Sequence, residues 1–547
     1  MRPTDWRFWS ALFAAMVLLS YPAAAGDQCD SPQDPEAAII DCTQSINSGK
    51  WKGRNLAAFY NNRAAAYRAK GDNERAMADL NEAIRLDPKL AMAFNNRGAA
   101  YNERGDNDRA IADYNEAVRL DPKLAMAFNN RGNAFTDKGD NNRAIADFSE
   151  AIRLDPKFVR AFSNRGVAYY EQGDTERAIA DFNEAIRLDP KLARAFINRG
   201  NAFNDKDDND RAIADYSEAI RLDPQLAMAF QNRGSAYHDK GDNDRAIADY
   251  NEAIRLDPKH AKTFLGRGIA FRDKGDNDRA IADFSEAIRF NPEFARAFQN
   301  RGSAYHHKGD NDRAVADLTQ AIRLDPKNAG AFRVRGLAYR AKGDGDRAIA
   351  DLTEAIRLDP KEANTFIIRG IAYFTKGDND RAIADYNEAI RLDPKSYLAY
   401  SARGRSYFSA GSAEKALADF NRASAIDPTD AYTALWVDIA GQRNNLPSRL
   451  AQASSKVDMT VWPAPIIRLF MNQMTPDAVL AAIDDPDASK SKDKVCEVYF
   501  YSGELALTKG AKDEATRLFR RVVSDCPQDF DERDGAIAEL KALGAAP

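Results

Sequence analysis

Residues that usually build metal sites and catalytic centres are scarce in this chain of 547 residues. It contains four histidines and four cysteines. His306 and His307 are adjacent and would diverge on a helix, and His238 is remote from both, so none of them makes a credible metal pair. The sequence has no nucleophile–base set, no phosphate loop and no cofactor motif. We therefore expect no metal, no cofactor and no enzymatic activity.

Strong charge of one sign is also missing. The 78 basic and 83 acidic side chains give a formal charge of −5, and both signs are interleaved along the chain. A nucleic-acid surface needs a basic cluster, so nucleic acid is not an expected partner. After residue 25 no apolar run is long enough to cross a bilayer.

The first 25 residues differ from the rest. Arg2 and Arg7 precede the apolar run "FWSALFAAMVLLSY", and "PAAAG" places small residues at Ala23 and Ala25. This order is typical of a secretory signal peptide (1–25) that is cut after Ala25. The alternative is an uncleaved membrane anchor, since residues 8–25 are mostly apolar. We expect an exported protein, periplasmic or secreted, with no stable membrane span after cleavage.

What the sequence has in abundance is repetition. Numbering each copy so that Gly98 stands at position 8, this glycine recurs every 34 residues up to Gly404, with Ala64 in the first copy. Phe94, Gly98 and Tyr101 share one face of a first helix, and positions 20, 24 and 27 share one face of a second. The period and the pattern resemble the tetratricopeptide repeat family.

The resemblance implies an all-α fold, a right-handed superhelical α-solenoid of helix–turn–helix repeats. Eleven repeats fill residues 57–430. Within each, Gly105 and Asp106 are expected to end the first helix and cap the second, and Asp121 with Pro122 to supply the N-cap and first-turn proline of the next repeat. The first helices should line a concave groove.

Both ends of the array depart from the repeat, as terminal units of a stack must. Residues 26–56 read as an N-terminal capping half-repeat in which Cys29 and Cys42 occupy facing positions. Residues 431–547 form a helical module with one degenerate repeat (496–529), which places Cys496 near Cys526, and a capping helix. In an exported chain these pairs are expected to form disulfides.

The C-terminal module also resembles the NlpI family of bacterial envelope lipoproteins. The resemblance rests on the order of "LWVDIAGQ", "FYSGELALTKGAKDEATRLF" and "AIAELKALG" between residues 430 and 545. It implies envelope hydrolases or proteases as candidate partners.

Two charged positions never vary between the eleven copies. Position 7 is always arginine and position 23 always aspartate, as in Arg97 with Asp113 and Arg199 with Asp215. A charge beside a helix–helix seam needs a partner, so we expect an Arg–Asp ladder, within a repeat or between neighbours. The alternative is that each arginine extends to water and only its stem packs.

Recognition is expected at the positions that vary. Family resemblance assigns partner contacts to positions 2, 5, 6, 9, 12 and 13. Position 6 is asparagine in the first six copies, which resembles a ladder that holds a ligand's backbone; a solvated row is the alternative. Later copies mix apolar and basic groups, suited to a peptide with apolar anchors and acidic character, although the apolar ones can instead pack on the C-terminal module. The candidate groove residues are Asn96, Asn130, Asn164, Asn198, Asn232, Arg272, Asn300, His306, Arg333, Arg340, Ile367, Ile371, Phe374, Arg405 and Phe408.

The sequence thus predicts a non-enzymatic, exported scaffold that holds an extended or helical peptide of a protein partner. The alternative is a structural envelope protein that self-associates into a homo-oligomer.

Overall fold

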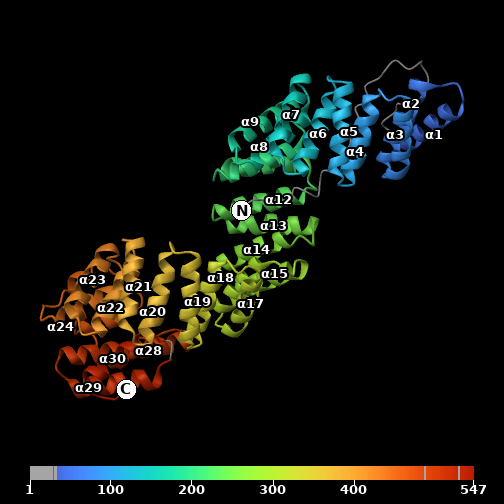
Figure 1. Cartoon of the computed structure of the whole chain (residues 1–547). Helices are drawn as coiled ribbons and strands as arrows, with labels where there is room; N and C mark the ends of the chain where they lie inside the picture. The colour runs from blue at the N-terminus through green and yellow to red at the C-terminus, as the bar shows by residue number, and fades with distance from the viewer. Residues whose placement is uncertain (1–28, 30–33, 486–487, 528–529, 547) are drawn as a thin grey trace. The chain divides into compact units, whose positions relative to one another are not determined.

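A computed structural model describes residues 29, 34–485, 488–527 and 530–546 (Figure 1). These residues form helices and no strand, arranged as tandem helical hairpins of a helical solenoid. The predicted signal segment, residues 1–25, lies outside the described part. Where the chain is described, no helix combines the length and apolar character that crossing a bilayer requires. The chain divides into two compact units, Met1–Pro258 and Lys259–Pro547.

The first unit contains an isolated helix followed by six helix pairs, one pair for each of the first six repeats. The helices are α1 (Pro35–Asn47), α2 (Gly53–Ala69), α3 (Asn73–Leu86), α4 (Ala91–Glu103), α5 (Asn107–Leu120), α6 (Ala125–Asp137), α7 (Asn141–Leu154), α8 (Val159–Glu171), α9 (Thr175–Leu188), α10 (Ala193–Asn204), α11 (Asn209–Leu222), α12 (Ala227–Asp239) and α13 (Asn243–Leu256).

The second unit contains the pairs of repeats seven to eleven and the C-terminal module, which begins at α24. The helices are α14 (Ala261–Asp273), α15 (Asn277–Phe290), α16 (Ala295–His307), α17 (Asn311–Leu324), α18 (Ala329–Ala341), α19 (Gly345–Leu358), α20 (Ala363–Thr375), α21 (Asn379–Leu392), α22 (Tyr397–Ser409), α23 (Ala413–Ile426), α24 (Ala431–Arg443), α25 (Leu450–Ala453), α26 (Ala464–Phe470), α27 (Pro476–Ala481), α28 (Ala488–Thr508), α29 (Lys512–Asp525) and α30 (Asp531–Ala542).

The glycine at position 8 is the point of closest approach between the two helices of a repeat. A Cβ on Gly132 would lie 2.6 Å from the ring of Phe148, and one on Gly98 would lie 2.8 Å from the ring of Tyr114. Both rings are buried. Glycine at position 8 therefore lets an aromatic residue at position 24 fill the seam.

The turn inside each repeat follows the expectation from sequence. Gly105 has φ +77°, in the left-handed region that favours glycine. The Asp106 carboxylate then accepts a hydrogen bond from the backbone N–H of Arg109 at 3.1 Å and caps α5. Its other oxygen pairs with the Arg109 guanidinium, which stacks on the ring of Tyr101.

The turn between repeats corrects one expectation. Asp121 is not the N-cap of α6, and Pro122 is not in its first turn, because α6 begins at Ala125 with Leu124 at its N-cap. Asp121 instead ends α5, and its carboxylate accepts from the backbone N–H of Lys123 at 3.0 Å while its carbonyl accepts from Leu124. Proline with its fixed φ therefore stabilises a tight turn between the helices.

The constant arginine and aspartate form a ladder in all eleven repeats. Arg97 donates from Nε and Nη2 to the two oxygens of Asp113 at 2.7 and 2.8 Å. The same bidentate pair joins positions 7 and 23 in every other repeat, with distances from 2.7 to 2.9 Å. The aspartates are buried, so these pairs hold first and second helices of one repeat together.

The third guanidinium nitrogen joins neighbouring repeats. Nη1 of Arg97 donates to Asn81 in the preceding repeat at 2.9 Å, and Nη1 of Arg199 donates to Asn183 at 2.6 Å. The partner stands at position 25 of the preceding second helix and is asparagine, serine or threonine. Each arginine thus fixes both the hairpin and the stacking of one hairpin on the next.

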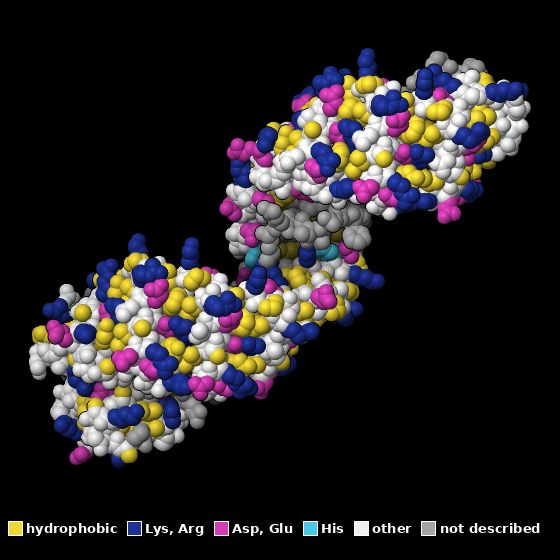
Figure 2. Space-filling model, in the orientation of Figure 1, with side chains coloured by type: hydrophobic (Ala, Val, Ile, Leu, Met, Phe, Trp, Pro, Cys, Tyr) yellow, Lys and Arg dark blue, Asp and Glu magenta, His cyan; other side chains and the backbone are white. Residues whose placement is uncertain are grey.

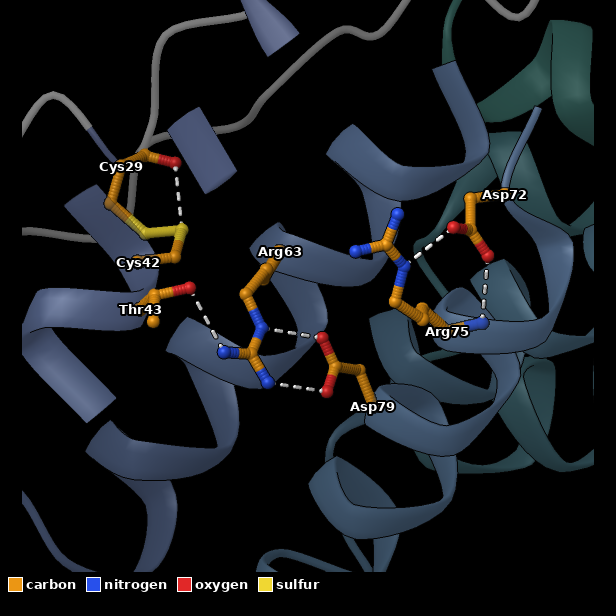
Figure 3. A network of polar contacts seen from close by, with 7 residues as sticks. All are labelled: Cys29, Cys42, Thr43, Arg63, Asp72, Arg75 and Asp79. Carbon is orange, nitrogen blue, oxygen red and sulfur yellow. Dashed lines mark hydrogen bonds and ion pairs between the residues drawn. A yellow bond between two sulfur atoms is a disulfide. The ribbon is translucent and has the colours of Figure 1, made fainter. Parts of the chain in front are cut away.

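Each end of the chain carries a disulfide. Cys29 is bonded to Cys42, with the Cα atoms 5.0 Å apart, beside the Thr43–Arg63–Asp79 contacts of the first repeat (Figure 3). Cys496 is bonded to Cys526, with the Cα atoms 5.9 Å apart. No cysteine is free.

The C-terminal module continues the core of the last repeat. Trp436 of α24 stacks on Phe420 of α23 with ring centroids 5.5 Å apart, and it also contacts Phe500 of α28. A Cβ on Gly503 would lie 2.6 Å from Phe519, the same approach that the regular repeats show. The module therefore closes the stack with a repeat-like hairpin, α28 with α29, followed by α30.

Candidate binding surface

The first helices form the inner face of each unit. First helices of neighbouring repeats, such as α4 with α6 and α16 with α18, contact each other more extensively than second helices of neighbouring repeats do. In a curved stack the elements on the concave side lie closer together. We use "inner face" for positions 2, 5, 6, 9, 12 and 13 of the first helices. Figure 2 shows both signs of charge among apolar side chains on the molecular surface.

A hydrogen-bonded chain of amides runs along the inner face of repeats one to four. Asn96 donates to Asn61 at 2.9 Å, and Asn95 donates to Asn96 at 3.3 Å. Asn130 then donates to Asn95 at 3.0 Å. The same alternation continues through Asn129 to Asn164.

This chain revises the interpretation of the asparagine row. The position-6 amides are half-buried and are engaged by buried position-5 amides of the same and the preceding repeat. Asn198 is itself buried, and Asn232 donates to Asn201 at 2.8 Å. The row is therefore neither fully solvated nor wholly available to a ligand, and part of its hydrogen-bonding capacity joins neighbouring repeats.

The inner face of the second unit carries cations. Arg272 donates to Asn300 at 2.6 Å and pairs with Asp273, and His306 shares a hydrogen bond with Asn311 at 2.7 Å. Within the described residues, the guanidinium groups of Arg333 and Arg340 have no hydrogen-bond or acidic partner. Burial, and then the neighbouring His306 and Arg272, lower the pKa of His307.

Two apolar groove candidates are placed differently from the expectation. Ile367 is 7% exposed and its neighbour Ile368 is 8% exposed. Ile367 packs with Tyr386, Ala399 and Ala402, between the tenth and eleventh repeats. Ile367 is therefore used in packing between repeats, and its contact with a partner stays a prediction. Ile371 is half-buried and stays at the inner face.

The chain's own C-terminal module covers the remaining candidates. Phe374, Arg405 and Phe408 line a small pocket whose other side comes from α24, α28 and α30. Its enclosed space of about 20 Å³ is room for roughly one water molecule. Helix α30 contacts α22, beside α24 and α28 (Figure 1). These three residues therefore face the module instead of an open groove.

A buried charge cluster lies in this contact. Arg443 of α24 donates to Glu504 of α28 at 3.0 Å and lies 3.2 Å from Glu539 of α30, with its guanidinium over the ring of Phe408. Glu504 is fully buried, and its Oε1 has no hydrogen-bond partner in the described residues. Burial, and then the neighbouring Glu539, raise the pKa of Glu504 to about 8.

A second buried carboxylate anchors the module. Glu497 accepts from Trp462 Nε1 at 2.7 Å and from the Tyr432 hydroxyl at 2.9 Å. Burial raises the pKa of Glu497. Across the described residues no group of three His, Cys, Asp or Glu side chains is arranged to hold a metal ion.

These features define the class of protein: a helical repeat scaffold with a constant frame and a variable inner face. A family model described as TPR repeat matches residues 64–103, 98–136, 132–173, 168–206, 200–241 and 234–271. Another, described as Tetratricopeptide repeat, matches residues 265–329, 308–363 and 369–431. Together these matches cover more than half of the sequence, and the chain belongs to the tetratricopeptide repeat family.

Solved structures share the repeat fold. The APC/C hetero-tetramer Cut9–Hcn1 has a similar chain with 16% identity and TM-score 0.43, covering 75% of this chain and 93% of that one. A tetratricopeptide repeat protein from Parabacteroides merdae is similar at 20% identity and TM-score 0.38, covering 45% and 98%. YrrB, described as a TPR protein with an unusual peptide-binding site, is similar at 24% identity and TM-score 0.30, covering 34% and 95%.

Proposed function

We propose that the protein is an exported, non-enzymatic scaffold whose inner face holds a segment of a protein partner. The fold itself suggests a protein-interaction scaffold. The observation that carries the proposal is that some positions of the repeat are constant and others vary. Positions 7 and 23 are constant and paired, whereas inner-face positions change from copy to copy.

Export is supported by three features. The first 25 residues have the order of a signal peptide, and all four cysteines are bonded, as disulfides in an oxidising compartment are. The C-terminal helix order resembles the NlpI family of envelope lipoproteins. We accordingly propose a periplasmic or secreted location and candidate partners among envelope proteases and hydrolases.

Recovery of partners from an envelope fraction tests the proposal. The bait is the mature chain, with Arg340→Glu and Ile371→Asp combined as the inner-face variant. Both sites lie on first helices at half-buried positions, so we expect the variant to lose a protein that the wild type recovers. Arg357→Glu, on the outer helix α19 of the same repeat as Arg340, is the matched control and should retain it.

Two outcomes would count against the proposal. Equal recovery by all three baits means that the inner face is not used. A chain recovered from the cytosol whose mass spectrum shows residues 1–25 still attached would contradict the exported location.

A further inference from the structure

In the first unit, three position-12 side chains on the inner face reach the acid at position 13 of the next repeat. Arg68 pairs with Glu103, and Tyr170 donates to Asp205. Asn102 donates to Asp137 at 2.9 Å. An acidic residue stands at position 13 in repeats two to seven, namely Glu103, Asp137, Glu171, Asp205, Asp239 and Asp273.

In repeats seven to nine position 12 becomes cationic, and from repeat eight onward position 13 is no longer acidic. Position 12 is Arg272, His306 and Arg340 in repeats seven to nine. The position-13 residues that follow them in the next repeats are His307, Ala341 and Thr375. Arg68 of the first repeat thus has an acid at position 13 of the next repeat, whereas Arg340, at the same position of repeat nine, has Thr375 there.

The surroundings of Arg340 and Arg333 in the structure agree with this pattern. Arg340 and Thr375 stand in the same relation as Arg68 and Glu103, yet in the described residues the Arg340 side chain has no acidic partner, and its Nε is shielded from solvent. Arg333 is likewise unpaired. Burial lowers the pKa of His307, and the neighbouring His306 and Arg272 lower it further.

We infer that the inner face of repeats seven to nine, formed by Arg272, His306, Arg333 and Arg340, docks an acidic, extended peptide segment whose carboxylates pair with Arg333 and Arg340. The inference rests on the proposed function and specifies the chemistry of the partner segment. Leu337 and Ile371 lie half-buried among these cations and offer apolar contacts to peptide side chains. The C-terminal module already covers the inner face beyond them, at Phe374, Arg405 and Phe408.

An acidic peptide is favoured over a nucleic acid by what surrounds the cations. Base stacking needs exposed aromatic rings, and the inner-face positions of α16 and α18 carry none besides the histidines of α16. The apolar neighbours are aliphatic. The carboxylates of a peptide can also pair with these cations as Glu103 pairs with Arg68 between neighbouring repeats of the first unit.

Fluorescence anisotropy with a defined probe tests the inference. The probe is a labelled twelve-residue peptide of alternating glutamate and leucine, compared with the same peptide carrying glutamine in place of glutamate. We expect salt-sensitive binding of the acidic probe by the disulfide-bonded mature chain. Arg333→Ala combined with Arg340→Ala should weaken it by about tenfold or more, since partly shielded charges are lost.

Thr375→Glu is the sharper variant because it restores the missing acid without removing a cation. Thr375 is exposed, so the new carboxylate is expected to pair with Arg340 as Glu103 pairs with Arg68, and to weaken probe binding to a similar extent. Arg357→Glu on the outer helix α19 changes the net charge as much as the double alanine variant and should leave binding unchanged. Thermal unfolding confirms that each variant is folded.

The outcomes separate the two proposals. The inference is overturned if the glutamine probe or a single-stranded oligonucleotide binds as well as the acidic probe, or if Thr375→Glu binds it like the wild type. If the acidic probe fails while envelope partners are still lost with the inner-face variant, the scaffold proposal stands alone. If neither binds the inner face, both fall.

Discussion

At the scale of single residues, the constant arginine explains why a charge repeats where an apolar residue would fit a helix seam. Two nitrogens of the guanidinium donate to the aspartate of the same repeat, and the third donates to a side chain of the preceding repeat, as in Arg199. A planar fork with several fixed partners loses little flexibility on binding. The same arginine therefore holds the two helices of a hairpin together and orients the hairpin on the preceding repeat. A leucine makes no hydrogen bonds and could not orient the hairpin in this way.

Removing one aspartate tests this role. In Asp215→Ala, Arg199 keeps its hydrogen bond to Asn183 but loses its buried counter-charge. We expect the free energy of unfolding to fall by about 1–4 kcal/mol, because an unpaired charge stays in the seam. Urea unfolding followed by circular dichroism measures the loss.

The matched control lies on the same helix. Glu218 forms an exposed pair with Arg221, and Glu218→Ala should cost less than about 0.5 kcal/mol. Equal losses in the two variants would mean that the ladder contributes no more than an ordinary surface ion pair.

At the scale of helices, α30 and the Arg443 cluster cover the inner face of the last repeat and so form the end of its exposed part. Glu504 and Glu539 approach one arginine from α28 and α30, in a contact that also covers Phe408. Only one of the two carboxylates is fully buried. We therefore expect the stability of this contact to depend on the protonation of Glu504, whose pKa is raised by burial.

This dependence gives a signed prediction for pH. Because the pKa of Glu504 is raised to about 8 in the folded module, the folded state holds a proton there that the unfolded chain releases near pH 4.5. Stability is then full below about pH 4.5 and falls as pH rises to about 8, by up to about 1.4 kcal/mol per pH unit. The charges around this site are Arg405, Arg443, Glu532 and Glu539.

Glu504→Gln should remove that slope, since the amide stays neutral. Trp436 and Trp462 lie in the C-terminal module, so tryptophan fluorescence during urea unfolding between pH 5 and pH 8 reports the module. Glu514→Gln, at an exposed pair on α29, is the control and should keep the wild-type slope. Identical slopes in wild type and Glu504→Gln would show that Glu504 ionises freely.

At the scale of the whole molecule, the sequence is most informative where the physics is local and repeated. The helical hairpins, the Asp106 cap and the Arg97–Asp113 pair all follow from register, because a fixed period fixes which faces meet. The amide chain was missed because position 5 is asparagine in only three copies. Coverage of Phe374 and Phe408 by α28 and α30 depends on packing between segments distant in sequence, which periodicity does not encode.

The turn at Asp121 was misassigned for a local reason. An Asp-Pro pair suits both the start of a helix and a tight turn. Only the position of α6 distinguishes them, and Leu124 at its N-cap leaves the pair outside the helix. The proposed binding surface is thus the part of the inner face that is not used by the Arg–Asp frame, by the stacking contacts or by the C-terminal module.

Site-specific photo-crosslinking in cells tests this central claim most directly. A photoreactive amino acid is placed at His307 or Thr375, exposed inner positions, and at Arg323 or Arg357, exposed outer positions. The account predicts crosslinks to a protein partner from His307 and Thr375 and none from Arg323 and Arg357. Crosslinks from the outer positions alone, or equally from all four, would contradict it.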